Sequence, residues 1–169
     1  MDCKAIVEKL GLIKHPADDG AHFKELWRST RKITVVTDPE SYDGERTSGT
    51  SIYFLMQEKA LVTFHILPSD ELFYWHRGGN VKVHLISKDG VYRSEILGDM
   101  MSSDDANYQV RVPRNHWYAV EMEDATQSCL YSAVVVPGWE AKDWKEGKRD
   151  DLISKFPKHR DLIERLTTE

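Results

Sequence analysis

The sequence predicts an all-β protein, a sandwich, barrel or jelly roll, with short helices at both ends of the chain. Short runs rich in Val, Ile, Tyr, Phe and Trp follow one another through most of the chain, as is typical of strands. Turn-forming residues separate these runs, for example Gly78-Gly79-Asn80 and Lys88-Asp89-Gly90. Because little helix-like sequence lies between the runs, a parallel α/β sheet is disfavoured.

The first element is a helix. Asp2 is suited to cap its N-terminus, and Gly11 ends the pattern. Apolar side chains recur at i, i+3, i+4 and i+7, which places them on one helical face: Cys3, Ile6, Val7 and Leu10.

The strands follow. The expected strands are residues 32–36, 51–56, 61–67, 71–76, 81–86, 91–97, 108–112, 117–122 and 128–136. After Pro137-Gly138 the period changes to that of short helices packed outside the barrel. Their apolar stripes are Leu152, Ile153 and Phe156, then Leu162, Ile163 and Leu166. The run 140–151 is dense in both charge signs and predicts a solvated helix face.

Length and composition indicate one domain over residues 1–169, with a barrel core from about 31 to 137 and a helical tail from about 140 to 167. The net charge of -5 argues against a nucleic-acid partner, which would need clustered Lys and Arg. No apolar run is long enough for a membrane span or a signal peptide. With only Cys3 and Cys129, we expect a reducing, cytoplasmic setting.

Two polar stretches are candidates for the chemistry. In the first, His65, Glu71 and Gly78 surround a turn built by Pro68-Ser69-Asp70. Since strand residues i and i+2 share a face, His65 and Leu67 should both point into the barrel, and Glu71 should enter from the next strand.

The second stretch is Pro113-Arg114-Asn115-His116-Trp117-Tyr118. Asn115 tolerates the left-handed backbone conformation that glycine adopts in such turns. His116 precedes Tyr118 by two residues, so the two side chains can share a strand face.

Together these stretches resemble the cupin superfamily, and within it the cupin-5 subfamily of unknown function. The first matches His-x-His, three or four residues, Glu, six residues, Gly, with Leu67 in place of the second His. The second matches Pro-x-Gly-x-x-His, with Asn115 and Tyr118 at the Gly and final His positions. The resemblance implies a double-stranded β-helix, or jelly-roll, barrel and a homodimer formed through the β-sheets. Further matching segments are 15–16, 23–29, 50–55, 97–98, 112–113, 135–139 and 156–159.

The resemblance bears on metal binding. A cupin metal usually takes three His and one Glu, whereas only His65 and Glu71 occupy those positions here. We therefore expect no cofactor. If a divalent metal binds, His65, Glu71 and His116 are its expected ligands.

Metal-free acid-base catalysis is a second possibility, because sugar-nucleotide epimerases with a similar barrel use a His base and a Tyr acid on opposite sides of a sugar ring. His65 and Tyr118 would take these catalytic roles, with Glu71 orienting the imidazole. The alternative is that His65 and Glu71 only satisfy each other's hydrogen bonds.

Ligand binding without chemistry is a third possibility, and the sequence leaves open whether the protein is an enzyme. The expected ligand is a small molecule, with a nucleotide or nucleotide-sugar as the leading candidate. The competing classes are a metal-dependent oxygenase or decarboxylase and a non-catalytic ligand sensor. The expected ligand-binding residues, beside His65 and Tyr118, are Glu71, Phe73, Trp75, His116, Arg28 and Tyr53.

Overall fold

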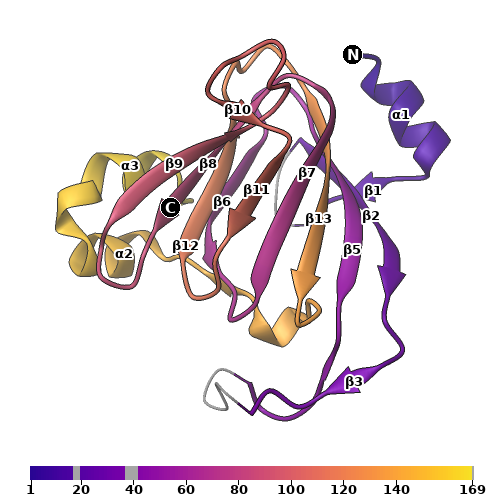
Figure 1. Ribbon diagram of the computed structural model, residues 1–169. Coiled ribbons are helices and arrows are strands. Elements are labelled where there is room, and N and C mark those ends of the chain that lie inside the picture. Colours follow the sequence, from indigo (N-terminus) through magenta and orange to yellow (C-terminus); the bar gives the residue numbers. More distant parts are fainter. Residues whose placement is uncertain (17–19, 37–41, 169) are drawn as a thin grey trace.

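The computed structural model describes residues 1–16, 20–36 and 42–168. Two six-stranded sheets face each other and form a jelly-roll barrel, which confirms the all-β prediction (Figure 1). In order, the first sheet contains β1 (Ile13–Lys14), β2 (Ala21–Arg28), β5 (Thr50–Met56), β13 (Cys129–Val136), β7 (Asp70–Gly78) and β11 (Gln109–Val112). The second contains β10 (Ala106–Asn107), β9 (Tyr92–Leu97), β8 (Val81–Ile86), β12 (Trp117–Met122), β6 (Leu61–Ile66) and β14 (Lys145–Glu146).

The N-terminal part of the first sheet differs from the expectation. The sheet includes β1 and β2, which precede the expected start of the barrel core at about residue 31. Most of β2 is exposed and carries Lys24, Glu25 and Arg28, so it lacks the apolar alternation that identifies a strand in sequence. The expected strand 32–36 is shorter, because only β3 (Lys32–Ile33) pairs, with β4 (Arg46–Thr47).

The core fills the space between the sheets, with inward side chains from both. Phe54, Phe73 and Tyr131 come from the first sheet, and Leu85 and Val120 from the second. Each fully buried side chain of this size stabilises the fold by roughly 1.5–3 kcal/mol relative to the exposed state.

The helical ends match the prediction. Asp2 caps α1 (Cys3–Leu10), and Gly11 ends it with a left-handed φ of 63°. At the other end, α2 (Arg149–Lys155) and α3 (Arg160–Arg165) follow the barrel, with the short turn η3 (Pro157–His159) between them (Figure 1). Ile153 and Ile163 of these helices share an apolar cluster with Ile86 of β8. Among the described residues, no helix is both long and apolar enough to cross a bilayer.

The charged segment 140–151 is not the solvated helix face that the sequence suggested. It begins with the single turn η2 (Ala141–Asp143) and continues through β14, and only then does α2 start. Most charged side chains of the segment are exposed, as expected, but Asp143 is buried in an ion pair with Arg46.

Candidate functional site

A cavity of about 380 Å³ lies inside the barrel. Its walls come from both sheets and from the segment after β13, and they are mostly apolar and aromatic. Such a volume lies within the range of roughly 300–1,000 Å³ that is typical of small-molecule sites. Glu25 and Trp139, which are exposed, also line the cavity and mark where it opens to solvent.

The two sequence motifs meet in this cavity. His65 on β6, Glu71 on β7 and Tyr118 on β12 all line it. His65 and Tyr118 are direct neighbours across the antiparallel pair β6 and β12, with ring centroids 4.0 Å apart. Asn115 has the left-handed φ of 59° expected for its turn, and its N–H donates to the carbonyl of Leu67 at 2.8 Å. The turn of the second motif is thereby fixed to the end of the first.

Glu71 and Tyr118 form the central polar contact of the cavity. The Tyr118 hydroxyl donates a hydrogen bond to Oε2 of Glu71, whose side chain is deeply buried. Burial raises the pKa of Glu71 to about 7, and the hydrogen bond from Tyr118 acts in the opposite direction. At neutral pH this carboxyl therefore has both protonation states within easy reach, as acid-base chemistry requires.

His65 is oriented by the backbone of its own strand. Its Nδ1 lies 2.8 Å from the carbonyl oxygen of Thr63. Because a carbonyl only accepts, Nδ1 must carry the proton, and in the neutral imidazole the lone pair is then on Nε2. The expectation that Glu71 orients His65 is wrong, since the hydrogen bond of Glu71 among the described residues goes to Tyr118.

The expected arrangement of base and acid on opposite sides of a sugar ring is also wrong. The rings of His65 and Tyr118 touch, so no ligand ring fits between them. The cause is the strand register, which sets these residues directly opposite each other on neighbouring strands. Both groups therefore act from one wall of the cavity.

Of the further expected ligand-binding residues, Phe73 lines the cavity, whereas Trp75 and Tyr53 do not. Trp75 stacks on Tyr108 at 5.8 Å and packs on the core outside the cavity lining. Tyr53 alternates with the cavity-lining Ile52 and Phe54, so it points to the outer face, where its ring meets His76.

Arg28 and His116 also lie outside the cavity lining. The guanidinium of Arg28 pairs with both oxygens of Glu25, at 3.1 and 2.7 Å, and donates to the carbonyl of Trp139 at 3.1 Å. His116 lies in the turn before β12, and its Nδ1 is 3.2 Å from the carbonyl of Arg114.

The donor set does not fit the metal site of a cupin. Leu67 supplies no ligand atom, and the hydroxyl of Tyr118 is turned to an oxygen of Glu71. His116, the expected third ligand, is not brought to His65 and Glu71. Within residues 1–16, 20–36 and 42–168, no group of three or more His, Cys, Asp or Glu side chains is arranged to hold a metal ion.

The sequence reasoning missed the wall that follows β13. Trp139, Ala141 and Trp144 line the cavity, and the Trp144 ring lies 5.9 Å from that of His65. Trp144 inside the charged stretch 140–151 and Trp139 directly before it were the available signal, because a solvent-facing helix seldom carries tryptophan. Glu25 on β2 and His15 directly after β1 also line the cavity. They were missed because the sequence did not identify these two strands.

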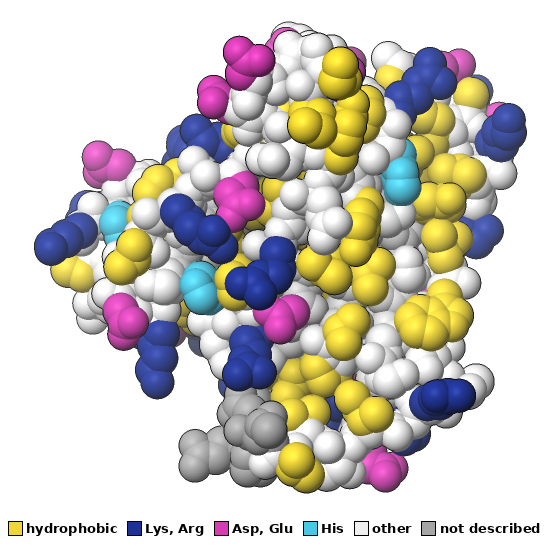
Figure 2. All heavy atoms as spheres, in the orientation of Figure 1, with side chains coloured by type: hydrophobic (Ala, Val, Ile, Leu, Met, Phe, Trp, Pro, Cys, Tyr) yellow, Lys and Arg dark blue, Asp and Glu magenta, His cyan; other side chains and the backbone are white. Residues whose placement is uncertain are grey.

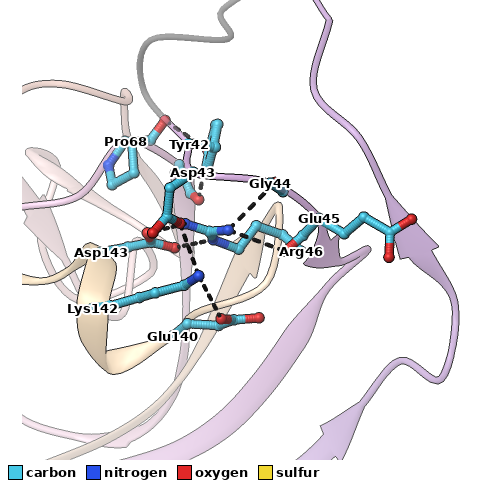
Figure 3. Close-up of polar contacts among 10 residues, drawn as sticks. Tyr42, Asp43, Gly44, Glu45, Arg46, Pro68, Glu140, Lys142 and Asp143 are labelled. Carbon is cyan, nitrogen blue, oxygen red and sulfur yellow. Dashed lines mark hydrogen bonds and ion pairs between the residues drawn. The ribbon is translucent and has the colours of Figure 1, made fainter.

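A buried ion pair holds this wall in place. Arg46, only 1% exposed, donates from Nε and Nη2 to the two carboxylate oxygens of Asp143, both at 2.7 Å (Figure 3). Nη2 also donates to Asp43 at 2.6 Å, and Nη1 donates to the carbonyls of Gly44 and Glu45. Because the pair is buried, removing either partner would leave an uncompensated charge inside the protein.

The same cluster reaches the turn of the first motif. The Tyr42 ring lies 5.3 Å from the Arg46 guanidinium, and its hydroxyl donates to the carbonyl of Pro68 at 2.9 Å (Figure 3). It also lies 3.0 Å from the hydroxyl of Ser69. The ion pair thus connects β4 and η2 to the turn between His65 and Glu71.

Comparison with known proteins agrees with this fold. Protein SO0799 from Shewanella oneidensis is 24% identical, with a TM-score of 0.82 over 99% of this chain and 98% of that one. A hypothetical protein from Leishmania major is 25% identical, with a TM-score of 0.84 over 98% of both chains. Oxalate decarboxylase from Bacillus subtilis shares the fold at 14% identity and a TM-score of 0.52, over 87% of this chain and 35% of that one.

No curated protein matches the chain. The family model described as Cupin superfamily (DUF985), Cupin_5, matches residues 4–146, which is most of the sequence. The chain belongs to the Cupin_5 family of the cupin superfamily.

Proposed function

We propose that the protein binds a small ring-containing metabolite in the barrel cavity and moves a proton on it without a metal, as an isomerase would. The hydrogen bond between Glu71 and Tyr118 inside a mostly apolar cavity carries this proposal. Ionised Glu71 takes a proton from the ligand, becomes a neutral carboxyl and returns the proton to a neighbouring atom. Tyr118 stabilises the ionised form by its hydrogen bond, and His65 lies beside Tyr118 on the same wall.

The cavity also narrows the ligand class. Of the described residues that line it, none is Lys or Arg, so the walls offer a phosphate no cationic side chain. Arg28, one of the expected ligand-binding residues, pairs with Glu25, and the ammonium of Lys24 donates to the carbonyl of Leu10. For a nucleotide or nucleotide-sugar, the base or sugar would therefore lie inside and the phosphates outside the opening.

Solvent deuterium tests the chemistry. Nucleosides, nucleotides, nucleotide-sugars and free sugars are incubated with the protein in D₂O and examined by mass spectrometry for carbon-bound deuterium. We expect incorporation into one class, and a rate lower by at least about a hundredfold in Glu71→Gln and Tyr118→Phe. If a compound that binds gains no deuterium, the proton transfer is refuted and the protein is a ligand sensor.

The homodimer remains a prediction. Its surface would be the outer face of the first sheet, where Leu26 and Val136 are exposed. Figure 2 shows hydrophobic side chains spread over the face that β5, β7 and β13 form. Sedimentation equilibrium with Val136→Lys, which should favour the monomer, tests it.

A further inference from the structure

The acidic side chains that the described residues contribute to the cavity have no Lys or Arg beside them in its lining. Two carboxylates, Glu25 and Glu71, line it together with the imidazoles of His15 and His65. The part of the chain that the structure describes contributes no Lys or Arg to this lining. An anionic ligand would therefore meet carboxylates and ring faces, and a cationic ligand would meet its natural partners.

Glu71 has an unused acceptor. Tyr118 donates to Oε2, while Oε1 receives no hydrogen bond from any residue that the structure describes. The side chain is 7% exposed and lines the cavity, so a ligand occupying this space is positioned to supply the missing donor. A charged N–H group is among the strongest hydrogen-bond partners of a carboxylate oxygen.

The aromatic walls favour the same ligand. Trp139 and Trp144 line the cavity together with Tyr131 and Phe23. The face of an aromatic ring carries negative electrostatic potential and attracts cations, tryptophan most strongly. These rings also provide flat apolar contacts for a ligand ring.

The carboxylate of Glu25, unlike that of Glu71, has a cationic partner. It pairs with Arg28 through both oxygens, so the opening of the cavity holds a carboxylate and a guanidinium together. Among the described residues that line the cavity, none supplies such a cation to Glu71, deeper in the barrel. The cationic group of a ligand is therefore expected to lie at Glu71.

We propose that the ligand is a ring-bearing amine or basic heterocycle whose protonated nitrogen donates to Oε1 of Glu71 while its ring packs on Trp139 and Trp144. This names the ligand class for the cavity, so it rests on the ligand binding proposed above and not on the proton transfer.

Three indole compounds of similar shape test the charge preference: tryptamine, which is cationic, tryptophol, which is neutral, and indole-3-acetate, which is anionic. Isothermal titration calorimetry at millimolar ligand measures each affinity. We expect tryptamine to bind at least about tenfold more tightly than tryptophol, and indole-3-acetate most weakly.

Glu71→Gln should remove the advantage of tryptamine over tryptophol. Asp70→Asn is the matched control: Asp70 is the neighbouring carboxylate on β7, outside the cavity lining, and accepts from the N–H of Arg114 at 3.1 Å. It should keep the advantage. The order of the three affinities in the unmodified protein is a test in itself, whether or not the variants fold.

Equal or tighter binding of indole-3-acetate overturns the cation preference and leaves the cavity as a ligand site. A preference for tryptamine that persists in Glu71→Gln overturns the role of Glu71. If none of the three compounds binds, this inference fails, whereas the proposed function is still decided by the deuterium exchange described above.

Discussion

Arg46 on β4 donates two parallel hydrogen bonds to Asp143, 97 residues further along the chain. The pair fixes η2, and with it the segment that brings Trp139 and Trp144 to the cavity. Gly138 at the start of this segment is needed for close approach, since a Cβ there would lie 2.3 Å from a methyl group of Thr47. The wall of the site therefore depends on an ion pair that lies outside the cavity lining.

Removing Arg46 should destabilise the protein strongly. In Arg46→Ala the buried Asp143 loses its partner, and breaking a buried pair in this way costs on the order of 3–5 kcal/mol. Lys142→Ala removes the partly exposed contact to Asp43 and should cost less than about 1 kcal/mol. Urea unfolding measures both variants. Equal losses would show that the buried pair is not the stronger restraint.

The stability of the protein should depend on the ionisation of Glu71. Its pKa is about 7 in the folded state, against an ordinary value of 4.5, so between these values the native state binds more protons than the unfolded state. Raising the pH from 4.5 through 7 should therefore lower the free energy of unfolding, by on the order of 3 kcal/mol from this group. Glu71→Gln should lack this contribution. Identical pH profiles for the two proteins would exclude the raised pKa.

Tyr118→Phe should raise the pKa of Glu71 further. The hydroxyl favours the ionised carboxylate, and without it the effect of burial is unopposed. Carboxyl carbon chemical shifts, followed by NMR across the pH range, report this pKa directly. A pKa that is unchanged or lower in Tyr118→Phe would mean that the hydrogen bond does not act on the charged form.

Asn115 offers a matched pair of substitutions. Its φ of 59° is left-handed, and Asn adopts this conformation more readily than Ala because its polar side chain can hydrogen-bond to the nearby backbone. Asn115→Ala should therefore lower the free energy of unfolding by roughly 1 kcal/mol. Asn115→Gly should be close to neutral. Thermal unfolding distinguishes them, and an alanine variant as stable as the glycine variant would contradict the assignment of strain to this turn.

Much of the fold could be predicted from sequence because apolar runs and turn residues report local structure. Strands β5 to β9 and β11 to β13 were found in this way, since their inward faces are apolar. Strand β2 could not be, because most of it faces solvent. The burial of Asp143 depends on Arg46, and a partner so distant leaves no local pattern.

The site was predictable only in part for a similar reason. Motif spacing indicated His65, Glu71 and Tyr118, which do share the cavity. Spacing did not indicate which of the three contact each other. The strand register places His65 opposite Tyr118, and the Tyr118 hydroxyl donates its hydrogen bond to Glu71. Trp75 was an expected ligand contact but lies outside the cavity lining, because strand alternation gives the face of a side chain and not how far along the barrel the cavity extends.

The most direct test of the account is a thermal-shift panel of ring-containing metabolites, run with and without chelator on the unmodified protein and on Ala133→Leu. Ala133 lines the cavity, so leucine there should narrow it, whereas Val134→Leu on the outer face of the same strand is the control. We predict that a ligand at a hundredfold excess over its Kd stabilises the unmodified protein and Val134→Leu by about 2.7 kcal/mol. Chelator should not change this, and Ala133→Leu should lose it. Stabilisation that survives in Ala133→Leu, or that chelator abolishes, would contradict a metal-independent site inside the barrel.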